Sequence, residues 1–540
     1  MGNISTGDLD PACRVFTTSK PPVDCVHCPA TTIQPLLDAF AAGSVQCAHL
    51  LPDLPGPRTG GMVGLGISFS LPVVLSACPH NALNALYRRH LLPPVNKARP
   101  FINFFLSLDT VCSAFKREYW AYMAAHDPDS WRVGKGLVKL KQIDRSFVFD
   151  RQRLDRAESF IKRESVLKLK KARLIQGNVN EYTAYNKPLE YKAIAHALKA
   201  STQQFTFGGV DFDFYYAAGM NHDELSDLFS SWLMTSDVLY FDERDGKNWD
   251  STMQEVTLRM EADVYALVHD QISKDFLKRS SGCRGRIRLK WGFIRYLTAW
   301  KRLSGDWNTS VGNTMISMMI VVHAILSLPP HLRPHRVRGL FMGDDYLGAY
   351  YYKQLPDPDD LCVALNTFEA QCGIEPIRAI FRDPAYVSFI SMGLWPRHGG
   401  GYQFVPHPAR QLAKLNWTVR NMTGRSIPDQ ATALAIAFIP VYEGYPLMQD
   451  FLRAQLLVRH PKITIDAHDF YFFESLSKRG REVDWRSGFM QKYNLPYTAC
   501  DWQLGSNDCA IYHHPVHSIM LQFETADPCD RRGAVGRKQI

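Results

Sequence analysis

The sequence predicts an α+β protein in which an antiparallel sheet is backed by helices. Short apolar runs that end at acidic or glycine-containing turns predict strands at residues 238–241, 340–342 and 346–350. Apolar residues at helical spacing after residue 309 predict a long buried helix. The chain has 540 residues, of which 46% are hydrophobic and 12% aromatic, so it can bury a large core. We therefore expect one multi-lobed body or two to three subdomains, and not a disordered chain.

The first predicted strand, Val238–Phe241, leads to the acidic segment DGKNWD, which runs from Asp245 to Asp250. Ser251 and Gln254 then have the spacing of a capping box. Apolar residues follow at helical spacing: Val256, Met260, Val264 and Leu267. We therefore expect Asp245 at the carboxyl end of a strand, with a helix shortly after it. Capping of a helix is the alternative role for Asp250.

A segment rich in small and polar residues, Ser304 to Asn313, leads into the predicted long helix. The apolar residues that define this helix are Val311, Met315, Met318, Val322 and Ile325. The helix is expected to stop at Pro329 and Pro330. Ser304 and Gly305 are therefore predicted to lie in the loop that precedes a buried helix.

Gly343, Asp344 and Asp345 lie between two apolar runs that are predicted to form a hairpin. Glycine and aspartate are ordinary turn residues, so a loose surface turn is one interpretation. However, adjacent carboxylates at a hairpin tip repel each other unless a cation offsets them. Asp245, at the end of a separate strand, favours the second interpretation, because acids from two strands can share two Mg²⁺ ions roughly 3.5–4 Å apart.

Basic residues are concentrated between Lys135 and Lys171, whereas the net charge of the whole chain is only +9. This local excess favours a polyanionic partner over a general role in solubility, with a solvated helix face as the alternative. The sequence contains no GxxxxGK[ST] loop, which argues against a helicase or ATPase module.

In this order and spacing, the motifs resemble those of the RNA-dependent RNA polymerases of positive-strand RNA viruses, closest to the tombusvirus-like branch. Asp245-x4-Asp250 resembles motif A, Ser304-Gly305-x3-Thr309-x3-Asn313 resembles motif B, and the GDD sequence at 343–345 resembles motif C. The resemblance covers roughly residues 158 to 420. It implies a right-hand polymerase with fingers, palm and thumb. The implied activity is that of an RNA-directed RNA polymerase, a nucleotidyltransferase that replicates a viral RNA genome by two-metal transfer from rNTPs and releases pyrophosphate.

The same resemblance implies a role for each motif residue. Asp245 and Asp344 would bind Mg²⁺ directly, with Mn²⁺ as the alternative ion, and Asp345 would be a weaker or outer ligand. Asp250 and Asn313 would recognise the ribose 2′-hydroxyl. Thr309 would support this pair, and Ser304 with Gly305 would form a flexible loop that adjusts to the incoming nucleotide. The residue types agree, since a buried Asp–Asn pair rejects a sugar that leaves its polar groups unpaired.

A basic stretch from Phe160 to Gln176 resembles motif F, which holds the triphosphate of the incoming nucleotide. Its candidate phosphate-binding residues are Lys162, Arg163 and Arg173. Arg173 is the best candidate for a bidentate contact, because guanidinium geometry matches phosphate oxygens. The segment 408–414 resembles the region near motif E. Motif D often supplies a lysine as general acid, but this sequence offers only Arg378 and Arg382 there, and arginine is a poor proton donor.

The resemblance also implies four segments. Residues 1–95 would be an N-terminal extension, 96–232 the fingers with motif F, 233–423 the palm with motifs A to E, and 424–540 the thumb and C-terminal tail. Part of the fingers would be inserted at about 270–300. The implied partners are an RNA template, nascent RNA and rNTPs. A reverse transcriptase is the first alternative, although it would need a steric gate where Asp250 and Asn313 favour the 2′-hydroxyl. An RNA-binding replication scaffold is the second.

The N-terminal region carries weaker signals. Gly2 and Thr6 fit the myristoylation pattern, which predicts association with host membranes. The twelve cysteines show no disulfide framework, which favours a reducing compartment. The family resemblance then implies the host cytoplasm, at membrane-bound replication sites if Gly2 is acylated. Cys25 and Cys28 are candidate zinc ligands, with free thiols as the alternative. The apolar stretch from Gly61 to Cys78 contains glycines and a proline, so we expect a buried strand or loop there and not a membrane span.

Overall fold

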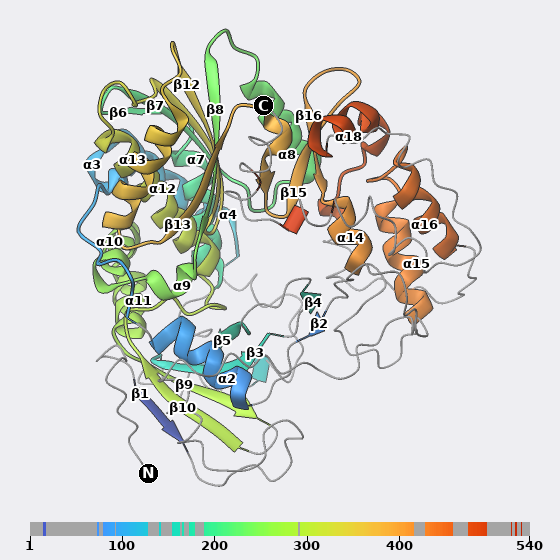
Figure 1. Ribbon diagram of the computed structural model, residues 1–540. Coiled ribbons are helices and arrows are strands. Elements are labelled where there is room, and N and C mark those ends of the chain that lie inside the picture. The colour runs from blue at the N-terminus through green and yellow to red at the C-terminus, as the bar shows by residue number, and fades with distance from the viewer. Residues whose placement is uncertain are drawn as a thin grey trace.

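The computed structural model describes the chain almost continuously from residue 188 to 414, together with parts of the remainder (Figure 1). The described residues are 14–17, 73–74, 79–91, 93–127, 140–141, 154–162, 165–166, 172–178, 188–289, 292–414, 427–456, 473–493, 520, 524–525 and 531. Several residues of interest lie outside these ranges: Gly2, Cys25, Cys28, Arg163 and most of the stretch from Gly61 to Cys78.

A six-stranded sheet forms the centre of the described structure, with the strand order β13-β8-β12-β11-β7-β6. The strands are β6 (Phe205–Phe207), β7 (Val210–Tyr216), β8 (Val238–Gly246), β11 (Arg336–Met342), β12 (Asp345–Tyr352) and β13 (Pro376–Phe381). Four of the neighbouring pairs are antiparallel, but β7 and β11 run parallel. The expected all-antiparallel sheet is therefore wrong at this pair: the long connection between β7 and β11 lets them run in the same direction. The expected boundary at 232/233 runs through this sheet, because β6 and β7 precede it.

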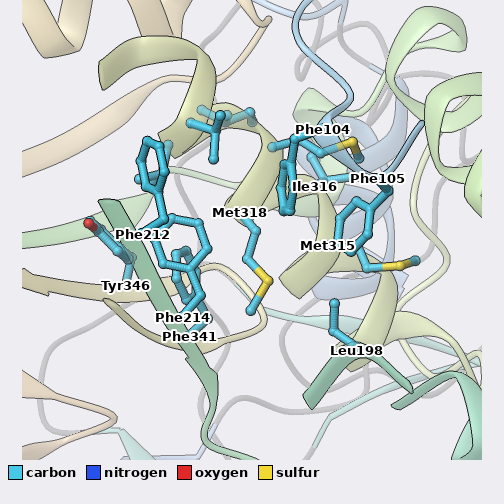
Figure 2. Close-up of a cluster of buried hydrophobic side chains, with 14 of the residues drawn as sticks. Phe104, Phe105, Leu198, Phe212, Phe214, Met315, Ile316, Met318, Phe341 and Tyr346 are labelled. Carbon is cyan, nitrogen blue, oxygen red and sulfur yellow. The ribbon is translucent and has the colours of Figure 1, made fainter. Parts of the chain in front are cut away.

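Helices cover one face of this sheet (Figure 1). They are α3 (Phe104–Ser107), α4 (Asp109–Ala125), α7 (Pro188–Ser201), α10 (Glu255–Ala266), α11 (Asp270–Ser281), α12 (Thr309–Ser327) and α13 (Pro358–Gln371). Figure 2 shows the core between the two layers, where Met318 of α12 extends toward Phe214 of β7 and Phe341 of β11, while Met315 lies beside Phe105 of α3. Helix α12 begins and ends where its apolar spacing predicts. It is long and apolar enough to cross a membrane, but most of it is buried, as in the core helix of a globular protein.

The opposite face of the sheet packs on a second apolar cluster, to which β14 to β16 and α8 contribute. These elements are α8 (His222–Trp232), η4 (Pro384–Tyr386), β14 (Ser388–Phe389), β15 (Met392–Pro396) and β16 (Tyr402–Pro406). Beyond them, a third cluster around Trp395 and Trp485 joins β15 to the C-terminal helices. The helices of that region are α14 (Pro408–Lys414), α15 (Ile427–Phe438), α16 (Pro446–Leu456), η5 (Gly480–Glu482) and α18 (Trp485–Tyr493). The six-stranded sheet is thus buried on both faces.

A separate five-stranded sheet has the order β1-β10-β9-β3-β5 and lies at the lower end of Figure 1. Its strands are β1 (Arg14–Thr17), β3 (Arg156–Ile161), β5 (Leu174–Asn178), β9 (Cys283–Leu289) and β10 (Gly292–Thr298). Helix α2 (Pro79–Leu86) and the π-helix η1 (Tyr87–Leu91) pack on one face of this sheet. A short pair, β2 (Val73–Val74) and β4 (Ser165–Val166), lies apart from it. The segment at about 270–300 therefore shares a sheet with the basic strands β3 and β5.

The capping box predicted for Ser251 and Gln254 is wrong. Asn248 precedes the short helix α9 (Trp249–Thr252), and Gln254 precedes α10 without a capping side-chain hydrogen bond. The Gln254 side chain instead accepts a hydrogen bond from the backbone N–H of Ala98 at 3.0 Å and donates to the carbonyl oxygen of Asn96 at 2.8 Å. A contact distant in the sequence has replaced the local one.

Candidate active site

The hairpin of β11 and β12 carries Asp344 and Asp345 at its tip, as predicted. Met342 pairs with Asp345, so Gly343 and Asp344 form a two-residue turn. The backbone N–H of Gly343 donates to the hydroxyl of Thr314 at 2.9 Å. Because Thr314 belongs to the buried helix α12, this bond fixes the acidic tip to the core.

Asp245 lies on β8, which pairs with β12 on the side away from β11. Tyr346 is opposite Arg244 in this pairing, so the next pair in the register brings Asp345 opposite Asp245. Side chains that are directly opposite in a sheet project to the same face, so the two carboxylates are cross-strand neighbours. The Asp245 side chain is exposed and those of Asp344 and Asp345 are partly buried. Acids from residues a hundred positions apart thus meet at one end of the sheet.

These carboxylates destabilise one another's charged forms. Burial raises the pKa of Asp344 well above its usual range, and the charges of Asp345, Asp250 and Asp245 raise it further. Burial, together with Asp245 and Glu243, raises the pKa of Asp345 to about 7, against the opposing effect of Arg244. Buried carboxylates whose pKa is raised by neighbouring carboxylates are the electrostatic signature of a site that a cation would stabilise.

No group of three or more acidic, histidine or cysteine side chains is close enough to form a complete metal cage in the described part of the chain. The donor set nevertheless fits Mg²⁺, which prefers carboxylate oxygens and is commonly bound through one or two carboxylates together with substrate phosphates. Asp245, Asp344 and Asp345 are the residues that could hold such ions.

Asp250 lies at the centre of a polar network that joins its own segment to both ends of the Ser304 to Asn313 segment. Ser304 Oγ donates to one carboxylate oxygen of Asp250, and Asn313 Nδ2 donates to the other at 3.2 Å. Thr309 contributes differently, because its hydroxyl lies 3.0 Å from the carbonyl oxygen of Leu303 and accepts from the N–H of Gly305 at 3.2 Å. Thr309 therefore shapes the loop and does not touch Asp250.

A buried ion pair, which the motif pattern did not single out, orients Asn313. Arg302 Nε donates to Asn313 Oδ1 at 2.8 Å, and Arg302 Nη1 donates to Glu261 of α10 at 3.1 Å. Both charged side chains are almost completely buried. Gly312 makes room for them, because a Cβ there would lie 2.2 Å from Glu261 Oε1. Glu261 lies outside the apolar face predicted from Val256, Met260, Val264 and Leu267, so the apolar pattern gave no signal of this pair.

The loop that contains Ser304 and Gly305 is attached to the five-stranded sheet through Gln176 of β5. The backbone N–H of Gln176 donates to Ser304 O at 2.7 Å, and Ser304 N–H donates to Gln176 Oε1 at 3.0 Å. Gly305 has φ +117°, and a Cβ there would lie 2.7 Å from Gln176 O. Both the backbone conformation and the close approach thus require glycine.

The structure places two of the three predicted phosphate-binding residues on neighbouring strand ends. The N–H of Lys162 donates to the carbonyl oxygen of Arg173 at 2.9 Å, so the two residues are adjacent across β3 and β5. Both side chains are half-buried. The third, Arg163, lies outside the described residues.

Arg378 does not face Asp245, because its neighbour Ile377 is the residue opposite Asp245. Its guanidinium is buried on the opposite side of β13, where it pairs with Asp242 at 2.7 Å and Glu369 at 2.6 Å. Arg244 joins the same buried network through Glu369 at 3.2 Å. These ions hold the sheet against α13, so Arg378 has a structural role in the core.

Residues 244–347 match the family described as viral RNA dependent RNA polymerase. This segment contains Asp245, Asp250, the Ser304 to Asn313 loop and both aspartates of the hairpin. The chain is therefore related to the viral RNA-dependent RNA polymerases. The family resemblance that the motifs predicted is confirmed.

Two curated relatives from plant viruses support this relationship. The RNA-directed RNA polymerase of Groundnut rosette virus (strain MC1) is 25% identical over 343 residues, which is 60% of this chain and 37% of that protein. The RNA-directed RNA polymerase of Panicum mosaic virus (strain United States/Kansas 109S) is 33% identical over 86 residues, which is 16% of this chain and 9% of that protein. The chain thus matches well under two thirds of the length of these polymerases.

Proposed function

We propose that this protein is an RNA-directed RNA polymerase that replicates a viral RNA genome. Its partners would be an RNA template, the nascent RNA and ribonucleoside triphosphates. The observation that carries the proposal is the meeting of the three motif segments in one place: Asp245 beside Asp345, Asp344 at the hairpin tip, and Asp250 bonded to Ser304 and Asn313. The family match over 244–347 covers the same segments.

The reaction is nucleotidyl transfer. The 3′-hydroxyl oxygen of the nascent RNA forms a bond to the α-phosphorus of the incoming nucleotide, the bond from that phosphorus to the bridging oxygen breaks, and pyrophosphate leaves. Bound Mg²⁺, or Mn²⁺, would activate the hydroxyl and neutralise the developing charge. Asp245 and Asp344 would hold the ions, with Asp345 in a weaker role. The mutual repulsion of these carboxylates favours cation binding once the substrate phosphates complete the coordination.

Asp250 and Asn313 select the sugar. The Asp250–Asn313 pair is already hydrogen-bonded, and Ser304 and Arg302 each donate to one of its oxygens. The Asp250 carboxylate keeps further acceptor sites, since each of its oxygens can accept more than one hydrogen bond. A ribose 2′-hydroxyl can join this network, whereas a deoxyribose leaves it incomplete. Lys162, Arg163 and Arg173 hold the triphosphate. This arrangement favours RNA synthesis over the reverse-transcriptase alternative.

The three bodies of the fold suit a right-hand polymerase. The six-stranded sheet with the acidic hairpin serves as the palm, the five-stranded sheet with Lys162 and Arg173 serves as part of the fingers, and the helices after residue 424 serve as the thumb. Support comes from Gln176, which joins the five-stranded sheet to the loop beside Asp250. A nucleotide bound between them would touch both.

One experiment tests the activity and the sugar class together. Purified protein is incubated with a heteropolymeric RNA and labelled UTP or dUTP, with and without Mg²⁺. Template-dependent incorporation of UTP alone, and only with the ion, is the expected result. Incorporation of dUTP would favour a reverse transcriptase, and RNA binding without incorporation of either would favour a replication scaffold.

The cellular site is a further part of the proposal: the host cytoplasm, at membrane-bound replication sites. It rests on the myristoylation pattern at Gly2, and one acyl chain binds membranes only marginally without a second signal. Flotation of the full chain and of Gly2→Ala from expressing cells tests it. Equal membrane fractions for the two proteins would reject acylation at Gly2.

A further inference from the structure

The five-stranded sheet has one covered face and one exposed face that is rich in arginine. Burial alternates along β3 and β9, so that Ser159 and Ile287 face the α2 side, whereas Arg284, Arg286 and Arg288 are exposed. The exposed face also carries Arg295 of β10 and Phe160 of β3, whose surface is 52% accessible. Phe160 thus adds an accessible aromatic ring to a surface that is otherwise dominated by arginine.

The strand register arranges these side chains in rows. Arg288 is opposite Phe293, and Arg286 is opposite Arg295 on the same two strands. Glu158 of β3 is opposite Arg286 of β9, and the two strands are parallel. Two residues further along each strand, Phe160 therefore lies beside Arg288 on the same face. We call this surface the arginine face and define it by Phe160, Arg284, Arg286, Arg288, Phe293 and Arg295.

The chemistry of the arginine face combines cations with aromatic rings. The Arg286 guanidinium lies 4.7 Å from the centroid of the Phe293 ring. Glu158 pairs with Arg286, and Asp155 pairs with Arg284 at 3.3 Å, but these two acids are outnumbered by the four arginines of the face. A positive surplus therefore remains exposed to solvent.

The arginine face is continuous with the candidate active site. Ile175 of β5 is opposite Phe160, and its Cγ2 would lie 3.1 Å from a Cβ added to Gly305. Lys162 and Arg173 follow at the adjacent end of the same two strands. The proposed triphosphate-binding residues and the arginine face therefore lie on the same side of β3 and β5, next to the loop that contains Gly305.

We propose that the arginine face binds single-stranded RNA and retains the template outside the catalytic centre. Guanidinium groups hold phosphates, and exposed aromatic rings stack on bases without selecting a sequence. A duplex would present its bases to neither ring. This inference rests on the proposed polymerase function for its purpose, but RNA binding by this face can be measured without nucleotides or metal.

The test compares two triple variants of equal charge. The first carries Arg284→Thr, Arg288→Thr and Arg295→Thr, because threonine suits exposed strand positions. The control removes three exposed cations from helices α4 and α7: Lys116→Ala, Arg117→Ala and Lys192→Ala. Urea unfolding midpoints first establish that the variants fold equally well. Binding is then measured over a series of salt concentrations, by fluorescence anisotropy, with three probes: a 20-nucleotide single-stranded RNA, its duplex, and vesicles of anionic lipid.

We expect the first variant to weaken single-strand binding by about tenfold to a hundredfold and to lower the salt slope by about 2, since each phosphate contact contributes roughly 0.7. The control variant should change neither the affinity for the single strand nor the salt slope. Phe160→Leu should weaken binding without changing the salt slope, because stacking releases no counterions.

Three results would overturn the proposal: equal losses in both triple variants, no loss in either, or a loss confined to the duplex or the vesicles. A wild-type protein that incorporates no nucleotide, but whose RNA binding falls only in the first variant, would reject the polymerase function and keep the arginine face. The two failures are therefore distinguishable.

Discussion

Replacement of Arg302 by methionine should separate the structural and functional roles of the buried ion pair. Arg302 and Glu261 are both almost fully buried, and Arg302 also donates to Asn313 at 2.8 Å. Removal of the guanidinium leaves the Glu261 carboxylate buried with only Asn308 and Tyr265 as donors. Breaking one side of such a pair typically costs about 3–5 kcal/mol of unfolding free energy.

The double variant Arg302→Met with Glu261→Gln should recover most of that loss. The glutamine amide oxygen can still accept from Asn308 and Tyr265, and no uncompensated charge remains in the core. We expect the double variant to lie within about 1–2 kcal/mol of the wild type, which is the usual cost of the hydrogen bonds that are lost. Urea unfolding, read as a shift of the midpoint at constant slope, measures both values.

Sugar selection should follow a different course. In both variants Asn313 Oδ1 has lost its donor, so the amide is no longer held with Nδ2 toward Asp250. The preference for UTP over dUTP should therefore fall by about tenfold in the single and in the double variant, which corresponds to one hydrogen bond of roughly 1–1.5 kcal/mol. Full sugar preference in a stable double variant would refute the positioning role of Arg302. A double variant as unstable as the single one would refute the account of the buried charge.

Four other outcomes are expected. Asp344→Ala should abolish synthesis with RNA affinity nearly unchanged, measured by primer extension and anisotropy. Arg173→Ala should raise the nucleotide KM and lower kcat; weaker RNA retention alone would reassign it to the template. Gly305→Ala should slow elongation and lower the unfolding free energy, measured with urea, by about 1–3 kcal/mol. Its control is Gly209→Ala, which has φ +78° and no atom near an added Cβ, so its unfolding free energy should fall only by the backbone strain. Burial raises the pKa of Glu524 to about 7, so the contribution of this carboxyl to the unfolding free energy falls as pH rises from about 4.5 to 7. The unfolding free energy of Glu524→Gln, relative to that of the wild type, should therefore be higher at pH 8 than at pH 5.

Several parts of the site were predictable because their signals are local. The hairpin around Gly343 follows from two apolar runs on either side of a turn sequence, and α12 follows from apolar residues at helical spacing that end at Pro329. The strand before Asp245 also forms, although β8 extends through Gly246, further than its apolar run. In each case the interactions that decide the structure lie within a few residues of one another.

Other parts were not predictable, because their partners are distant in the sequence. Helix α10 buries the face of Leu258, Glu261 and Tyr265, which is rotated from the face that its apolar residues predict. The Arg302–Glu261 pair stabilises that rotation, and Arg302 lies 41 positions away. Gln254 likewise bonds to the segment around Ala98 in place of a local cap. Long-range polar contacts outweighed the local pattern at these positions.

The sequence by itself determined the kind of protein, the motif residues and the strands and helices that carry them, because turn chemistry and apolar periodicity are properties of short segments. Only the tertiary structure decided which acids become neighbours, that β7 and β11 run parallel, and that Arg302, Glu261 and Gln176 hold the site together. These features depend on strand pairing and on buried charges that must find a partner, and both are settled only when the whole chain has packed.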